Sequence, residues 1–341
     1  MRWLALLIIY TVSLTRLLLA SRWSELILSG CVLGVLAIFF VVGLPLRQSP
    51  TGKDILVRTE TWCWMIGIFL LATALHPGVV FVLLAFLSFV ALREYFSLLP
   101  MYHRGTFLRA EDRPAIALAY LTIPATYWLG YDQWYLFYIV LIPVFATLCL
   151  PILLVATNNP QGILVSMGSI LAGMVLFVFL FSHAAILIWF SPIFLFYALL
   201  VTEMRDVLAY CFGKALSPLK WSWLHVAVAP KINPRKTWVG SALASFGCAG
   251  ISAAMAPLMP ELPAGRPSAQ YLFWLGFGVG WLGLAGDLAT GAIKRDLQVK
   301  DTGHALPGHG GVIDRINGVI FTVPVIFHLT WHIYSPGMVE L

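Results

Sequence analysis

Long apolar runs separated by short polar stretches make up most of this chain of 341 residues. About 20 apolar residues suffice for a helix to cross the ~30 Å hydrocarbon core of a membrane, and runs of this length recur along the whole sequence. The pattern predicts an all-α, polytopic membrane helix bundle with about 10 or 11 transmembrane segments. The predicted spans are residues 3–20, 25–46, 61–75, 78–98, 114–130, 133–157, 162–188, 191–213, 238–258, 270–293 and 312–334.

The composition agrees with a membrane protein. Hydrophobic residues make up 60% of the chain, charged residues 11%, and the mean hydropathy is +0.89. A soluble domain has about 25% charged residues. We expect residues 1–190 to form an N-terminal transmembrane bundle, and residues 191–341 to form a C-terminal region whose loops carry the polar motifs.

Basic residues gather in alternate loops, and the hairpins between those loops carry few. With eleven spans, the basic loops fall on one side, which the positive-inside rule makes cytoplasmic. We therefore expect a multi-pass protein of the cell inner membrane with its polar motifs facing the cytoplasm. These loops also account for the net charge of +6, so we expect no nucleic-acid partner. The basic stretches are residues 47–60, 99–113, 214–237 and 294–315.

Three segments place ionisable residues within or beside apolar spans, where such residues are costly and often functional. In a transporter, Glu203, Asp206 and Asp287 would line an ion path, but the sequence has no repeated pair of broken helices, which disfavours this alternative. The three segments are TEMRDVLAYCFG (residues 202–213), APKINPRKTWVG (residues 229–240) and GDLATGAIKRDLQVKDTGHALPGHGGVIDR (residues 286–315).

The third segment has the features of a metal and phosphate site. Asp287 lies near the end of one predicted span and Asp314 near the start of the next, and two carboxylates at a water-exposed junction suit Mg²⁺. The Gly308–Gly311 segment precedes a predicted helix N-terminus and can bring backbone N–H groups to an anion. Lys294 follows Asp287 by two helical turns and can reach a phosphate. The alternative is an ordinary loop with helix caps and salt bridges.

Several short motifs in these segments recur together in one known family. Asn233, Pro234, Lys236 and Thr237 are similar to a Ser-Pro-x-Lys-Thr motif, and Asp206 with Ala209, Tyr210 and Gly213 to an earlier one. Lys294-Arg295, Lys300-Asp301, Gly303, Leu306-Pro307, His309-Gly310-Gly311 and Asp314-Arg315 follow a long signature. Over about residues 190–334 the chain thus resembles the phosphatidate cytidylyltransferases, also called CDP-diacylglycerol synthases.

The resemblance implies that CTP and phosphatidate condense to CDP-diacylglycerol and pyrophosphate, with Mg²⁺ alone or with a second cation. The partners would be CTP, phosphatidate or a related phospholipid, the membrane, and a second copy of the chain in a homodimer. The residues implied are Lys294, Arg295, Lys300, Asp301, His309 and Arg315 for catalysis, Asp206, Asn233, Lys236, Thr237, Gly310 and Gly311 for nucleotide binding, and Asp287, Asp314 and Asn317 as metal ligands.

The sequence departs from the family pattern at four positions. Gly291 and Asn233 stand where the family has Ser, Asn317 where it has Asp, and Val239 where it has Glu. Gly291 and Asn317 lie on the same helix faces as the two expected metal ligands, so the site loses one hydroxyl and one negative charge. Two hypotheses follow: a divergent cytidylyltransferase, which includes one with an altered lipid acceptor, or a non-catalytic homologue that binds lipid or nucleotide.

Overall fold

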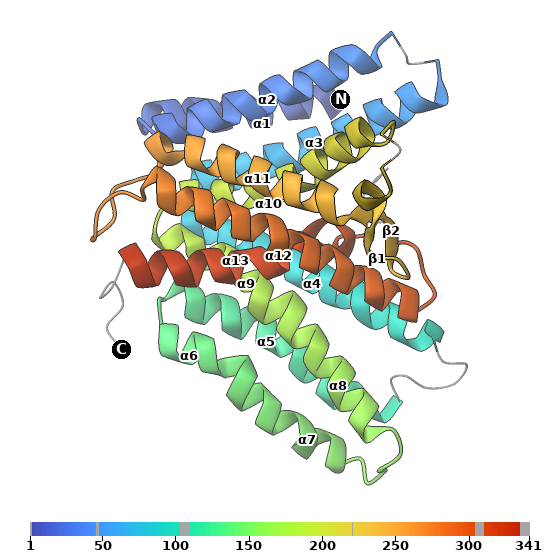
Figure 1. The fold of residues 1–341 in the computed structure, drawn as a ribbon. Helices are drawn as coiled ribbons and strands as arrows, with labels where there is room; N and C mark the ends of the chain where they lie inside the picture. Colours follow the sequence, from blue (N-terminus) through green and yellow to red (C-terminus); the bar gives the residue numbers. More distant parts are fainter. Residues whose placement is uncertain (1, 46–47, 103–109, 220, 304–309, 335–341) are drawn as a thin grey trace.

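The computed structural model describes residues 2–45, 48–102, 110–219, 221–303 and 310–334 of the chain (Figure 1). The long helices are α1 (Arg2–Leu19), α2 (Trp23–Gly43), α3 (Pro50–Leu75), α4 (Pro77–Tyr102), α5 (Arg113–Tyr131), α8 (Ile163–Met174), α10 (Pro192–Leu216), α11 (Trp238–Ala254), α12 (Ala269–Asp296) and α13 (Ile313–Tyr334). The shorter elements are α6 (Tyr135–Val140), α7 (Thr147–Val155), α9 (Phe181–Ile186), β1 (Ala227–Ala229) and β2 (Asn233–Thr237).

The protein is an all-α polytopic membrane bundle with one small hairpin. In Figure 1, α1 and α2 lie at one edge, α6 and α7 at the opposite edge, and α12 and α13 between them. Two π-helical turns, Leu141–Ala146 and Val175–Leu180, join α6 to α7 and α8 to α9 as continuous rods. Each predicted span coincides with one helix or one such rod.

Among the described residues, five helical segments are long and apolar enough to cross a membrane. Crossing by the other predicted spans stays a prediction, since those helices do not meet the same requirements of length and hydropathy within the described residues. The five segments are Pro77–Leu99, Tyr135–Val155, Ile163–Trp189, Ala269–Asp296 and Ile313–Tyr334.

In two of the predicted basic loops the structure adds a long helical extension or a hairpin. In the first, helix α3 already begins at Pro50, because the Ser49 hydroxyl accepts a hydrogen bond from the Gly52 N–H at 3.0 Å and proline suits the first helical position. In the loop predicted over residues 214–237, β1 and β2 pair as an antiparallel hairpin. The Thr237 hydroxyl at its end accepts a hydrogen bond from the Gly240 N–H at 3.1 Å and caps α11.

Small residues let α12 approach its neighbours closely. A Cβ at Gly280 would lie 2.6 Å from the Cα of Ser245 on α11, and a Cβ at Gly286 would lie 2.3 Å from the carbonyl oxygen of Asn317 on α13. Such backbone contact is the usual way in which membrane helices pack. It fixes the residues that follow Gly286 against the first turns of α13.

Helix α13 packs against elements on both sides of the predicted division at residue 190. Its neighbours include α4 and α9 from the N-terminal part, and α10 and α12 from the C-terminal part. The helix that begins next to Asp314 is therefore placed by both predicted regions.

Candidate active site

A network of charged side chains connects α10, β2 and α12 at one end of the bundle. The Lys236 ammonium lies 2.5 Å from Asp287 Oδ2 and 3.3 Å from Asp206 Oδ1. The Arg205 guanidinium forms an ion pair with the same oxygen of Asp206. One ammonium thus holds two carboxylates, of which Asp206 is 52% exposed and Asp287 21% exposed.

The Asp287 carboxylate has unused bonding capacity. Its Oδ2 is buried and, within the described part of the chain, has no aligned hydrogen-bond donor, so the contact with Lys236 is an ion pair only. Its Oδ1 accepts a hydrogen bond from the Asn317 side-chain N–H at 3.3 Å. The Asn317 side-chain oxygen faces its own helix and accepts the Gly318 N–H at 2.6 Å. Asn317 therefore presents a donor to Asp287, whereas metal ligation needs its oxygen.

Asp314 lies in a second cluster, at the start of α13, and its bonding capacity is largely used. Its Oδ1 contacts the Lys294 ammonium at 2.8 Å. Its Oδ2 accepts from the Thr302 N–H at 3.0 Å, the Thr302 hydroxyl at 3.1 Å and the Gly311 N–H at 3.2 Å. With these partners the side chain is only 7% exposed.

Asp287 and Asp314 therefore lie at the same end of the α12 and α13 pair, and each has its own lysine. Lys294, predicted to reach a phosphate, contacts Asp314 on the next helix in this structure. Among the described residues, no group of three or more His, Cys, Asp or Glu side chains is arranged to hold a metal. In this arrangement Lys236 and Lys294 lie where a metal cation bound to Asp287 and Asp314 would lie.

Glu94 on α4 is a member of this region that the sequence motifs did not indicate. Its carboxylate accepts the Val312 N–H at 2.9 Å and the Ile313 N–H at 3.1 Å, two donors at the start of α13. The Thr302 hydroxyl lies 3.5 Å from the same carboxylate. An ionisable residue within an apolar helix is the signal that could have found it.

The remaining predicted residues have varied surroundings. The Asn233 side-chain oxygen accepts the Arg235 N–H at 3.3 Å inside the hairpin. Arg295 Nε donates to the Ile232 carbonyl at 3.4 Å and ties the hairpin to α12. Lys300 and Asp301 are exposed, and His309 lies outside the described residues.

Two glycines and one arginine complete the predicted set. Gly310 has φ +80°, a left-handed conformation that favours glycine, and a Cβ there would lie 2.8 Å from Asp314 Oδ2. The Gly311 N–H donates to Asp314, as described above. Arg315 Nε is buried and has no hydrogen-bond partner within the part of the chain that is described.

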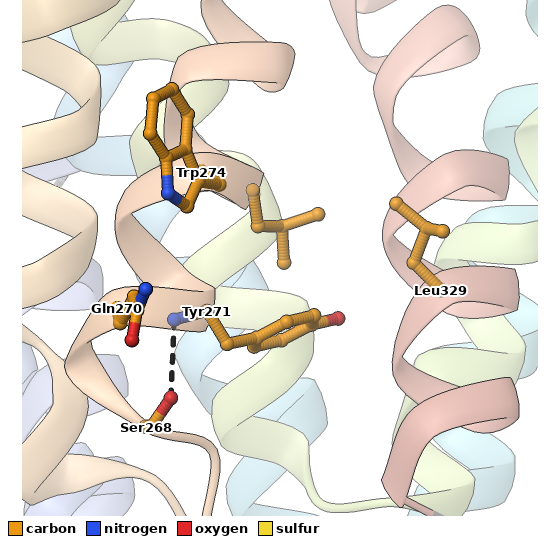
Figure 2. Close-up of a pocket in the computed structure, with 6 residues that line it drawn as sticks. Ser268, Gln270, Tyr271, Trp274 and Leu329 are labelled. Atoms are coloured by element: carbon orange, nitrogen blue, oxygen red, sulfur yellow. Dashed lines mark hydrogen bonds between the residues drawn. The ribbon is translucent and has the colours of Figure 1, made fainter.

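The opposite end of α12 and α13 has a different character. A shallow pocket of about 400 Å³ lies between the two helices there and is shown in Figure 2. The Tyr271 ring and Leu329 lie across it from one another, and Ser268 bonds the Tyr271 N–H at the start of α12. Because Tyr271 is four to five helical turns from Asp287, this pocket lies away from the charged network.

The fold and the site define a class of membrane protein. It is a multi-pass helix bundle in which a hairpin and two helix termini place ion-paired lysines and carboxylates at one end. The model of the Cytidylyltransferase family matches residues 56–333, and the chain belongs to that family. The match begins well before the motif-bearing half, so it includes Glu94.

Individual relatives agree with this membership. The chain is 31% identical to the uncharacterized protein YnbB of Escherichia coli over 298 residues, which are 85% of this chain and 91% of that protein. It is 36% identical over 106 residues to the phosphatidate cytidylyltransferase of Rickettsia felis, covering 30% of this chain and 46% of that enzyme. It is 35% identical over 136 residues to that of Bacillus subtilis, covering 40% and 46%. The match thus spans about half the length of these two enzymes.

Proposed function

We propose that the chain transfers a cytidylyl group from CTP to the phosphate of phosphatidate at its charged end, and that this end faces the cytoplasm from the inner membrane. An oxygen of the lipid phosphate attacks the α-phosphorus of CTP, the bond from that phosphorus to the β-phosphate bridging oxygen breaks, and pyrophosphate leaves. The nucleophile is already an anion, so the reaction needs positioning and charge stabilisation rather than a strong base.

The observation that carries the proposal is the Lys236 ammonium between Asp206 and Asp287. A site that holds lysines and carboxylates together on α10, β2 and α12 can accept a metal–triphosphate complex. The metal can replace the lysines at the carboxylates, and the phosphates can replace the carboxylates at the lysines. When CTP binds, the lysines can turn from the carboxylates to phosphate oxygens. The proposal gives Lys236 and Lys294 this role.

Other cations are available for the negative charge of CTP. Lys300 is exposed and lies four residues after the end of α12. Arg315 has a buried nitrogen without a hydrogen-bond partner in the described part of the chain, and a guanidinium suits phosphate oxygens. In the proposal these two residues stabilise the charge that develops on the leaving pyrophosphate.

The residues present fit a divalent cation once the lysines beside Asp287 and Asp314 have turned away. The buried Oδ2 of Asp287 has no aligned hydrogen-bond donor in the described structure, and carboxylate oxygens are the ligands that Mg²⁺ prefers. Asp287 would hold the cation, Asp314 would add its Oδ1 once Lys294 turns to phosphate, and Asn317 would add its oxygen after its amide rotates. When bound, Mg²⁺ would neutralise charge on the triphosphate and on the leaving group.

One observation favours a second candidate function, the binding of lipid or nucleotide without turnover of phosphatidate. The Asn317 amide presents its N–H to Asp287 and its oxygen to the Gly318 N–H. A site set for metal ligation would present the oxygen. The same Asn317 orientation also fits an enzyme that uses a different phosphorylated acceptor, because Asn adds no negative charge to the metal site.

The test is to incubate the purified protein in detergent with labelled CTP, Mg²⁺ and phosphatidate, and to measure both CDP-lipid and pyrophosphate. Equal amounts of the two products are expected, and none without phosphatidate. An Asp287→Ala variant is the control for contaminating enzyme. CTP binding without product would favour the second candidate, and product with another phospholipid phosphate would identify an altered acceptor.

A further inference from the structure

Glu94 connects the N-terminal helices directly to the start of α13. Its two carboxylate oxygens accept the backbone N–H groups of Val312 and Ile313 at 2.9 and 3.1 Å. The first N–H groups of a helix lack partners within the helix, so a carboxylate at this position stabilises the helix start. Here that carboxylate comes from α4, which lies more than 200 positions earlier in the sequence.

Two glycines of the signature leave the space that Glu94 occupies. A Cβ at Gly303 would lie 3.0 Å from Glu94 Oε1, and a Cβ at Gly311 would lie 2.3 Å from Thr302 Oγ1 and 2.5 Å from Glu94 Oε2. Neither glycine has a φ in the left-handed region, so their conformation does not require glycine. The space taken by the Glu94 carboxylate, together with the Thr302 hydroxyl at Gly311, gives them a physical reason.

The residues that contact Glu94 also hold Asp314. The Thr302 hydroxyl lies 3.5 Å from Glu94 Oε2 and 3.1 Å from Asp314 Oδ2, so it stands between the two carboxylates. Gly311 adjoins Glu94 and donates its N–H to Asp314. Moving the Glu94 carboxylate would therefore shift the donors that orient Asp314, and with them the partner of Lys294.

We infer that Glu94 is a positioning residue for the charged end: it fixes the start of α13 and the two donor residues Thr302 and Gly311, which in turn set Asp314 against Lys294. The N-terminal helices thereby contribute to a site whose recognisable motifs all lie after residue 190. That Glu94 fixes the start of α13 follows from the contacts alone. That this supports CTP binding rests on the proposed function.

The test compares Glu94→Gln with the wild type. Glutamine keeps the shape of the side chain but offers one acceptor where two backbone N–H groups need one each, so one N–H loses its partner. Glu261→Gln is the matched control, because Glu261 is 71% exposed and forms its ion pair with Arg266, away from the start of α13. If Glu94→Gln does not fold, Glu94→Asp keeps the charge and withdraws it by one methylene.

Two measurements are made on the folded fraction. In Glu94→Gln, hydrogen exchange should become at least about tenfold faster at whichever of the Val312 and Ile313 amides loses its acceptor, and should stay unchanged in the middle of α13. The KM for CTP should rise by about tenfold while the KM for phosphatidate stays within about twofold. A purely structural loss would lower the active fraction and leave the KM for CTP unchanged.

The outcomes separate the two claims. Unchanged exchange at Val312 and Ile313 would overturn the inference whatever the kinetics. Faster exchange with an unchanged KM for CTP would leave Glu94 a structural residue and would also overturn it. If the wild type makes no CDP-lipid, the proposed function fails, and the inference is then decided by exchange together with the affinity for CTP measured by calorimetry.

Discussion

The two ends of the α12 and α13 pair show what is special about the charged end. At that end, Asp287 and Asp314 are held by lysines in ion pairs of 2.5 and 2.8 Å. At the other end, the same two helices are joined by the Tyr271 and Thr330 hydroxyls at 3.0 Å, beside a pocket lined largely by rings and aliphatic groups. Both ends are held by polar contacts, but one set is charged and the other is neutral.

The difference matters because neutral hydroxyl pairs can stabilise membrane helices at little cost, whereas ionised groups near the bilayer are expensive. A bundle that needed only stability would not require lysines between carboxylates. The charged end also draws its residues from α10, the hairpin, α12 and α13, and from α4 through Glu94. Function is therefore expected at this end, and stability alone at the other.

The largest effect is expected from Asp287→Asn. The change keeps the volume but removes the charge that pairs with Lys236 and would hold Mg²⁺. Turnover of CTP should fall by roughly a thousandfold, which is the scale of losing a metal ligand or a key charge in a transfer site. The measurement is kcat for CDP-lipid formation. Activity above about a tenth of wild type would place the chemistry elsewhere.

Much of the fold was accessible from the sequence. Apolar runs mark helices because membrane segments must be apolar, and all the predicted spans coincide with helical segments. The β1–β2 hairpin was missed because its strands are only three and five residues long. The second strand has Pro234 and four charged or polar residues, so it reads as a basic loop. The early start of α3 was missed because Lys53 and Arg58 interrupt its apolar pattern.

The candidate site was accessible only as a set of residue types. The motifs indicated Asp287, Asp314, Lys236 and Lys294, but spacing along α12 suggested that Lys294 shares a face with Asp287. Its Asp314 partner depends on how the loop returns, which no local pattern encodes. Glu94 stands out as an ionisable residue within an apolar helix, but its partners at the start of α13 are fixed by tertiary packing.

The next prediction concerns Lys236→Met, which keeps an unbranched side chain one atom shorter and removes its charge. CTP should bind about tenfold more weakly, because one charge-assisted phosphate contact is lost. Asp206 and Asp287 would also lose their shared cation, so added Mg²⁺ should raise the thermal midpoint of the variant more than that of the wild type. Binding is measured by calorimetry. CTP affinity equal to wild type would exclude Lys236 from the nucleotide site.

A gain of function is expected from restoring the family residues. Asn317→Asp replaces the amide that donates to Asp287 with a second carboxylate, so the protein should be less stable without Mg²⁺ and should recover when it is added. Combined with Gly291→Ser, it should raise CDP-lipid formation by about tenfold, since one ligand interaction is worth about 1.4 kcal/mol.

The structure sharpens the design of that variant. A Cβ at Gly291 would lie 3.0 Å from Ile232 Cγ2 on the hairpin, so the serine needs Ile232 to shift slightly. Adding Ile232→Val relieves the contact, and Gly291→Ala with Asn317→Asp is the control that has the Cβ but no hydroxyl. Turnover that stays at background in every combination would support the non-catalytic alternative.

The smallest effect is expected at the opposite end, from Tyr271→Phe. The change removes the hydroxyl that pairs with Thr330 and keeps the ring that lines the pocket in Figure 2. Interhelical hydrogen bonds of this kind contribute about 0.6 to 1 kcal/mol, so the free energy of unfolding should fall by that amount in a denaturant titration. CTP turnover should stay within about twofold, because no charge at the other end is altered. Thr330→Val removes the other half of the same bond and should match it. A large loss of turnover in both variants, with little loss of stability, would show that the neutral end takes part in the reaction and that the contrast between the two ends is wrong.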